Sequence, residues 1–154
     1  MKNYYLLCLL ISLLLFGSCK AKKVIEGESP YSFDFVSTSS IVDLSDQAIA
    51  SDKLIFLDVY ADWCLPCKVM DEDVFTDRKL GDFYNNHFIS YKADAENGVG
   101  GEIANLFQVA GLPTLLFLDE NGNLLVENQG SVGVRKMYEL ADEAIAIKLE
   151  GTEE

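Results

Sequence analysis

The fold of this chain is decided by the stretch Leu54-Ile55-Phe56-Leu57-Asp58-Val59-Tyr60-Ala61-Asp62-Trp63-Cys64-Leu65-Pro66-Cys67-Lys68. Its first seven residues, 54–60, are almost all apolar, which is typical of a β-strand buried on both faces of a sheet. Two cysteines follow with two residues between them, and the chain then continues in a pattern that favours a helix. We therefore expect a strand that runs directly into a helix, with Cys64 and Cys67 where the helix begins.

The rest of the chain alternates between helical and strand patterns. Further helices are predicted at 43–50, 77–86, 102–108 and 134–149, and further strands at 88–93, 114–118 and 124–128. Ser45 and Thr76 are the predicted caps of the first two helices, and residues 98–101 are predicted to be a flexible turn. The predicted buried face of the last helix is Tyr138, Ala141, Ile145 and Leu149. Residues 31–35 alternate as an edge strand would.

This order of elements predicts the fold class. Strand–helix–strand connections require parallel pairing, whereas the Asn121-Gly122 turn makes the last two strands an antiparallel hairpin. We therefore expect an α/β fold, with a mixed central sheet and helices on both faces. Open sheets of this kind place their chemistry at the carboxyl ends of the strands, where the two cysteines lie.

The N-terminus reads as a targeting segment. Met1-Lys2-Asn3 is a short basic start, and the apolar run that follows is shorter than the ~20 residues that span a bilayer. We therefore expect a lipoprotein signal peptide over residues 1–18, a tether over 19–40 and a single folded domain over 41–154. Phe16-Gly17-Ser18-Cys19 resembles a bacterial lipobox, which implies that Cys19 carries a lipid. Ordinary cleavage nearby, leaving Cys19 as a thiol, is the alternative.

Four cysteines reduce to one available pair. Cys8 would leave with the signal and Cys19 would carry lipid, so Cys64 and Cys67 remain. A helix N-terminus stabilises a thiolate, which makes Cys64 the expected nucleophile and Cys67, one turn inward, the expected resolving thiol. A zinc site is the structural alternative. Zinc needs four ligands, and beyond these two thiols the only histidine is His87, which we expect at the surface or at a helix end. Copper(I) and a purely structural disulfide are further alternatives, and we expect no metal and no cofactor.

The formal net charge of −13 bears on the partners. Nucleic acid and anionic membrane surfaces would repel such a chain, so we expect no nucleic-acid partner. Membrane attachment would come from the lipid instead, with a small basic collar of Lys20, Lys22 and Lys23 beside the headgroups.

These residues resemble the thioredoxin superfamily. Trp63-Cys64-Leu65-Pro66-Cys67-Lys68 looks like its active-site motif, and Gly111-Leu112-Pro113-Thr114 looks like its cis-proline loop. Asp58, six residues before Cys64, matches the family's buried acid. Residues 59–64 and 71–77 look most like the C-terminal periplasmic domain of the thiol:disulfide interchange protein DsbD, and the chain also resembles thioredoxin-like lipoproteins. The resemblance implies a thioredoxin fold.

The resemblance also implies roles for individual residues. Asp58 would assist deprotonation of Cys67; the alternative is that it only forms an ion pair with Lys92. Pro113 would be cis and would bring the backbone of Leu112 beside the sulfurs, where an extended substrate segment could pair with it. A trans proline that starts an edge strand is the alternative.

The expected function is thiol–disulfide exchange in a bacterial cell envelope, on a lipid-anchored protein facing the periplasm. We expect it to reduce disulfides of envelope proteins, with Trp63 either contacting the substrate or packing in the domain. Unlike DsbD, the chain offers no hydrophobic spans that carry electrons across a membrane, so a separate membrane electron donor is implied. The alternatives are a disulfide oxidase or isomerase, and a binding or scaffold lipoprotein whose dithiol is incidental.

Overall fold

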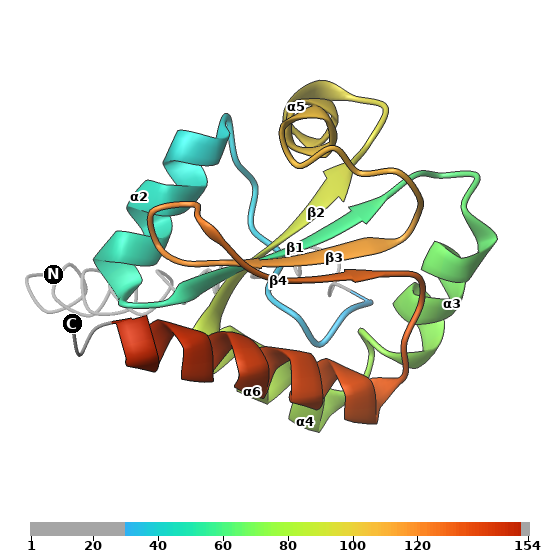
Figure 1. Ribbon diagram of the computed structural model, residues 1–154. Helices are drawn as coiled ribbons and strands as arrows, with labels where there is room; N and C mark the ends of the chain where they lie inside the picture. Colours follow the sequence, from blue (N-terminus) through green and yellow to red (C-terminus); the bar gives the residue numbers. More distant parts are fainter. Residues whose placement is uncertain (1–29, 152–154) are drawn as a thin grey trace, which may run out of the picture.

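A four-stranded mixed sheet with helices on both faces is the centre of the computed structural model, which describes residues 30–151 (Figure 1). The elements are α2 (Ile41–Ser51), β1 (Leu54–Tyr60), α3 (Leu65–Asp73), α4 (Arg78–His87), β2 (Phe88–Asp94), α5 (Gly98–Leu106), β3 (Thr114–Leu118), β4 (Leu124–Gln129) and α6 (Val134–Gly151). The strands lie in the order β2-β1-β3-β4. β1 pairs in parallel with β2 and antiparallel with β3, and β4 pairs antiparallel with β3. The predicted α/β fold is confirmed.

β1 is buried on both of its faces, as its apolar run predicted. Because side chains alternate along a strand, Phe56 and Asp58 face one side of the sheet, and Ile55 and Leu57 face the other. Phe56 belongs to the core cluster that α3, α4 and α6 cover, while Ile55 and Leu57 belong to the cluster under α2 and α5. Figure 1 shows α2 and α5 on one side of the sheet and α4 and α6 on the other. Asp58 is therefore the one acidic side chain that β1 directs into the first core.

Two helices begin at caps other than the predicted ones. Ser40 caps α2, because its hydroxyl accepts an N–H from the first turn at 3.1 Å, and Ser45 therefore lies inside the helix. Asp77 caps α4 in the same way at 2.9 Å. The hydroxyl of Thr76 instead donates to the carbonyl of Glu72, at 2.7 Å.

The glycine-rich stretch 98–101 is the first turn of α5 and not the flexible turn that we expected. Gly100 allows this, because a Cβ there would collide with the carbonyl oxygen of Asp94 in β2. In α6 the fully buried side chains are Met137, Leu140, Ala141 and Ala144. The predicted face of this helix is thus only partly correct, and Leu149 is 62% exposed.

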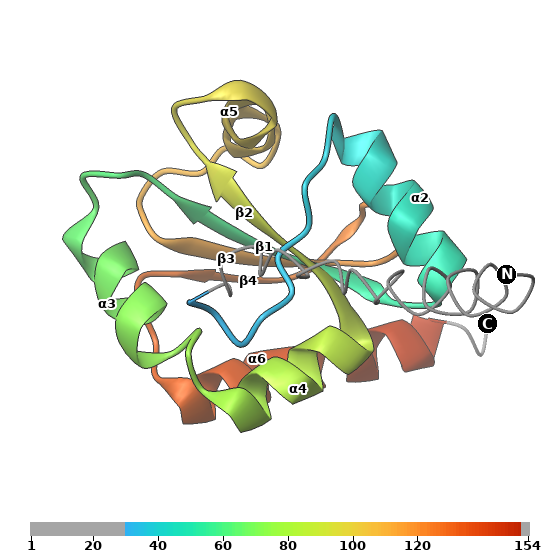
Figure 2. The ribbon, with the colours of Figure 1, turned by 180° about the vertical axis from the view of Figure 1, so that it is seen from behind.

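The chain before α2 runs along the outer edge of β2 (Figure 2). The predicted edge strand is reduced to a single parallel bridge between Phe35 and Ser90, beside which the N–H of Val36 donates to the Ser90 carbonyl at 2.9 Å. Phe33 is only 1% exposed and packs in the core. The packed domain therefore begins earlier than residue 41, because the core needs this ring.

The predicted signal peptide at 1–18, Cys19 and most of the predicted tether lie outside the described residues. Between residues 30 and 151, none of the helices has the length and apolar character needed to cross a membrane.

Candidate active site

Cys64 and Cys67 are joined by a disulfide at the start of α3, with an S–S distance of 2.06 Å and a Cα–Cα distance of 5.3 Å. Cys64 is the N-cap of the helix, and its sulfur accepts the backbone N–H of Cys67 at 3.3 Å. Pro66 lies in the first turn, where the missing N–H of proline costs no helical hydrogen bond. The helix therefore directs the positive end of its dipole at the sulfur of Cys64, and this stabilises a thiolate there.

The two sulfurs lie in a small apolar cluster of their own. Cys64 and Cys67 are 3% and 2% exposed and pack with Ala61, while Tyr60 and Leu112 pack against them from the sides. The Leu112-Pro113 peptide bond is cis, as expected. The ladder between β3 and β4 starts one residue after Pro113, at Thr114, so Leu112, which packs against the two cysteines, lies outside the ladder.

Apolar side chains are exposed next to the disulfide. Trp63 is 68% exposed, Leu65 is 71% exposed and Val69, one turn further along α3, is 47% exposed. Trp63 is therefore not a packing residue of the core. The three side chains offer an apolar surface beside buried sulfurs, which suits a polypeptide partner.

Asp58 and Asp71 share one lysine beneath the site. The Lys92 Nζ lies 2.6 Å from an oxygen of Asp58 and 2.5 Å from an oxygen of Asp71. Asp58 is 1% exposed, and its second carboxylate oxygen has no hydrogen-bond partner among residues 30–151. Sequence reasoning missed Asp71, because the acidic run 71–73 reads as a solvated helix face. The available signal was its spacing, one helical turn after Cys67.

The protonation of this cluster is set by burial and by the shared charge. Burial raises the pKa of Asp58, Lys92 acts to lower it, and Asp71 raises it further; the net shift is upward. Burial alone would lower the pKa of Lys92, but the two carboxylates outweigh it and raise this pKa above its ordinary value. Lys92 thus stays charged, and Asp58 holds a proton more readily than an ordinary aspartate.

Four aromatic rings surround the ammonium group of Lys92. Their centroids lie 4.6 Å (Tyr60), 5.0 Å (Phe75), 5.3 Å (Tyr31) and 5.4 Å (Phe35) from Nζ. Such rings attract a cation through their π faces and keep water away from it. Sequence reasoning missed them because they come from segments far apart in the chain.

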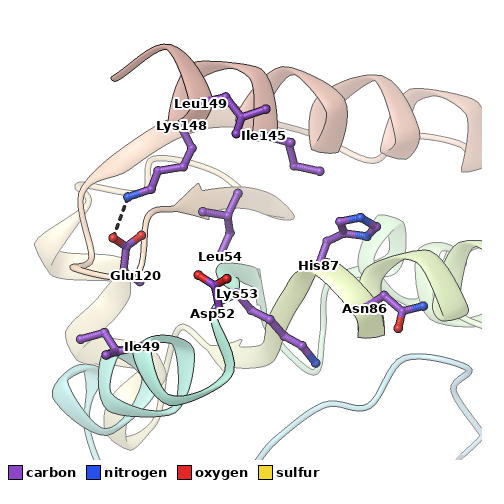
Figure 3. A pocket seen from close by; sticks show the side chains of 10 residues that line it. All are labelled: Ile49, Asp52, Lys53, Leu54, Asn86, His87, Glu120, Ile145, Lys148 and Leu149. Carbon is purple, nitrogen blue, oxygen red and sulfur yellow. Dashed lines mark hydrogen bonds and ion pairs between the residues drawn. The ribbon is translucent and has the colours of Figure 1, made fainter. Parts of the chain in front are cut away.

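A separate pocket of about 380 Å³ lies at the start of β1, at the opposite end of this strand from the two cysteines (Figure 3). His87 lines it, exposed at the end of α4, with Nδ1 2.8 Å from the Phe83 carbonyl. An ion pair between Lys148 and Glu120 at 2.6 Å also lies there. His87 is thus a helix-end histidine, as expected, and not a base for Cys64. Within the described part of the chain, no three side chains of metal-ligating type are grouped as a metal site.

Comparison with known proteins agrees with this geometry. The sequence model of the family described as thioredoxin-like domain matches residues 43–145. The thiol:disulfide interchange protein DsbD of Actinobacillus pleuropneumoniae serotype 5b (strain L20) is 35% identical over 100 residues, which cover 62% of this chain and 17% of that protein. DsbD of Yersinia pestis (strain Pestoides F) is 38% identical over 77 residues, covering 49% of this chain and 13% of that protein. The matches thus span less than a fifth of the length of these relatives.

Two solved structures show the same fold. The solution structure of a candidate disulphide-isomerase from Bacteroides thetaiotaomicron has a TM-score of 0.66 and 30% identity, covering 75% of this chain and 94% of that one. The C-terminal domain of Neisseria meningitidis DsbD in the oxidised form has a TM-score of 0.56 and 22% identity, covering 71% and 97%. The family match includes both cysteines and the cis-proline loop. The chain therefore belongs to the thioredoxin-like domain family, within the thioredoxin superfamily, and resembles DsbD.

Proposed function

We propose that this protein is a thiol–disulfide oxidoreductase in which Cys64 is the nucleophile and Cys67 the resolving thiol. The observation that carries the proposal is the position of the bonded pair, at the N-terminus of α3 and in contact with Leu112 of the cis-proline loop. A disulfide that only stabilised the fold would have no need of this position. Closing so short a loop constrains the unfolded chain little.

Reduction of a substrate then takes two exchanges. The thiolate of Cys64 attacks one sulfur of the substrate disulfide, which forms a mixed disulfide and releases the first substrate thiolate. The thiolate of Cys67 then attacks the sulfur of Cys64, which closes the Cys64–Cys67 disulfide and releases the second substrate thiolate. The two electrons of the dithiol pass to the substrate, and a dithiol donor must reduce the protein again.

Asp58 is the proposed acceptor of the proton that Cys67 loses. Its raised pKa, caused first by burial, makes it a better base than an exposed aspartate. Its unpartnered oxygen leaves room for a hydrogen bond, directly or through a water molecule, on the buried side of the site. The ion pair with Lys92, which was the alternative role for Asp58, is present in the structure and is compatible with this step.

The proposed substrates are proteins that carry an accessible disulfide. An extended segment would pair with the backbone of Leu112 next to Pro113 and would lay its apolar side chains on Trp63 and Leu65. This proposal is supported by the exposure of those two side chains and by the position of Leu112 outside the sheet ladder.

The proposed setting is the bacterial cell envelope, with the protein working as a reductase. The sequence resemblance to DsbD supports it, as do the signal-like N-terminus and the lipobox-like Cys19. A cell envelope is oxidising, so reduction would need electrons from a separate dithiol protein of the membrane. We propose that Cys19 carries the lipid that holds the domain at that membrane.

A trapping experiment tests the exchange itself. In Cys67→Ser, the mixed disulfide through Cys64 cannot be resolved and should accumulate with envelope proteins, while Cys64→Ser is the matched control that should trap nothing. Dithiothreitol-driven reduction of insulin should be lost in both variants. If Cys67→Ser traps no partner, or Cys64→Ser traps as many, the proposed roles are wrong. A reduction potential near about −120 mV, typical of strong oxidants, would contradict the reducing direction.

Disulfide isomerisation is the second candidate, because the Bacteroides protein with 30% identity is described as a candidate disulphide-isomerase. An isomerase shuffles disulfides with no net gain of electrons, so its activity survives without a resolving thiol. Refolding of scrambled ribonuclease by Cys67→Ser separates the two functions. Recovery at the parent rate would favour isomerisation, and loss of recovery would favour reduction.

A further inference from the structure

Residues 31–36 lie before residues 43–145, the part of the chain that the thioredoxin-like family model matches. Hydrogen bonds nevertheless attach them to the domain. The N–H of Ser32 donates to the carbonyl of Phe75 at 2.8 Å, and the side-chain amide of Asn85 donates to the Ser32 carbonyl at 3.0 Å. The N–H of Asp34 in turn donates to the Asn85 side chain at 2.8 Å. This segment is therefore held at a fixed position along the edge of β2.

The same segment covers the charged cluster below the dithiol. Tyr31 and Phe35 supply two of the four rings around Lys92, whose side chain is only 13% exposed. The hydroxyl of Tyr31 is also hydrogen-bonded to Asp71. The segment thus both shields the ammonium group and contacts one of the two carboxylates that share it.

We propose that residues 31–36 are a working part of the redox site, with Tyr31 as a positioning residue. Its hydroxyl binds Asp71 and thereby limits how far Asp71 draws Lys92 away from Asp58. The inference rests on the proposed function, since Asp58 affects the exchange only by taking a proton from Cys67.

The segment has two separable effects on the buried acid. The Tyr31 hydroxyl competes with Lys92 for Asp71, so its loss should move the ammonium group toward Asp71 and leave Asp58 harder to ionise. The rings exclude water, so their displacement should hydrate Asp58 and make it easier to ionise. The ionisable groups that face this cluster are Asp58 and Tyr60 from β1, Lys92 from β2, Asp71 from α3 and Tyr31 from the segment. Among these groups, Asp62 and Asp94 act on Tyr60.

The first test is Tyr31→Phe, which removes the hydroxyl and keeps the ring. The titration of Asp58 is followed in the reduced protein through the carbon-13 shift of its carboxyl group. This measurement does not depend on whether the protein exchanges disulfides. We expect its midpoint to rise by about half a unit, a roughly threefold change in the ionisation constant. Tyr138→Phe is the matched control, because this ring of α6 packs on Phe83 of α4 and the change should leave the midpoint unchanged.

The second test moves the segment by a substitution outside both the segment and the charged cluster. A Cβ at Gly81 would collide with the carbonyl oxygen of Ser32, so Gly81→Ala should push residues 31–36 outward. This variant displaces the rings together with the Tyr31 hydroxyl, and water that enters would hydrate both carboxylates, so the midpoint of Asp58 should fall, opposite to the effect of Tyr31→Phe. Tyr31→Phe alters no backbone contact, and so it remains decisive even if Gly81→Ala fails to fold.

Opposite shifts in the two variants would support the inference, and an unchanged midpoint in Tyr31→Phe would overturn it. The pH profile of the second exchange should move with the Asp58 titration; it is measured by stopped flow as release of the substrate thiol from a Cys64 mixed disulfide in protein that keeps Cys67. If Asp58 responds as expected but the parent protein exchanges no disulfides, the proposed function fails and the positioning contact stands. If the parent is active and Asp58 does not respond, only the role of Tyr31 is refuted.

Discussion

Replacing Lys92 with methionine should leave Asp58 as a buried and unpaired carboxylate. Methionine keeps an unbranched apolar stem among the four rings, so the change removes little besides the ammonium group. Asp58 would then lose its side-chain partner, at 2.6 Å the one hydrogen bond of this carboxylate among residues 30–151, in a site where it is 1% exposed. Asp71 would be affected less, because its side chain is 22% exposed and water can replace the lysine.

The magnitude follows from this difference in burial. Breaking a buried ion pair by removing one partner costs about 3–5 kcal/mol of unfolding free energy. We expect the lower end, about 3 kcal/mol at pH 8, because Lys92 is itself 13% exposed and water can partly fill its place.

The loss should depend on pH with a definite sign. Burial already raises the pKa of Asp58, and removing Lys92 removes a group that lowers it, so this pKa should rise further. Between the unfolded value of about 4 and the raised value, the native state holds a proton that the unfolded chain has released. The stability of Lys92→Met relative to the parent should therefore fall as pH rises through this window, and the deficit should be smaller at pH 5 than at pH 8.

Urea denaturation of the parent and of Lys92→Met at both pH values measures the effect. The control is Lys92→Met made in an Asp58→Asn background, where no carboxylate is left unpaired; there the loss should be under about 1 kcal/mol at either pH. Equal losses in both backgrounds, or a loss that does not depend on pH, would refute the account of Asp58 as a buried charge held by Lys92.

Three further outcomes follow from other parts of the structure. Trp63→Ala should change the unfolding free energy by no more than about 0.5 kcal/mol, because the ring is exposed; it should weaken peptide-disulfide binding about tenfold, measured as KM. Gly100→Ala should lower stability by about 1–3 kcal/mol in thermal unfolding because its Cβ meets the backbone of β2. The nearest atom to a Cβ at Gly101 is 3.4 Å away, so Gly101→Ala should melt no lower than the parent. Ser40→Ala should cost about 1 kcal/mol in urea denaturation through loss of the α2 cap, whereas Ser45→Ala should not.

The sheet and the position of the dithiol were predictable because they depend on local patterns. The apolar run of β1 and the turn before β4 both have short-range signatures, and together they specify the mixed sheet. The residues at which the helices begin were harder to predict from the sequence. Serines, threonines and aspartates crowd the ends of α2 and α4, and the sequence alone does not show which of Ser40 and Ser45, or of Thr76 and Asp77, takes the capping geometry.

The charged cluster shows the limit of prediction within the site itself. The pair Asp58–Lys92 was an available hypothesis through the resemblance to the thioredoxin superfamily. Asp71 belongs to the acidic run 71–73, which is typical of a solvated helix face, and nothing local marks one carboxylate of this run as bound. Tyr31 lies 61 positions before Lys92, and only the path of the chain along β2 brings the two together.

The burial of Phe33 determines where the independently folding unit begins. Its ring lies within 4.8–6.2 Å, centroid to centroid, of Phe35, Phe56, Phe75 and Tyr84. A chain trimmed to the family match at residue 43 would lose this ring, and emptying such a site costs about 3–5 kcal/mol. Trimming would also bare the outer backbone of β2, which could then pair with the same edge of another molecule. Proteolysis ahead of α2 would thus make the domain prone to self-association.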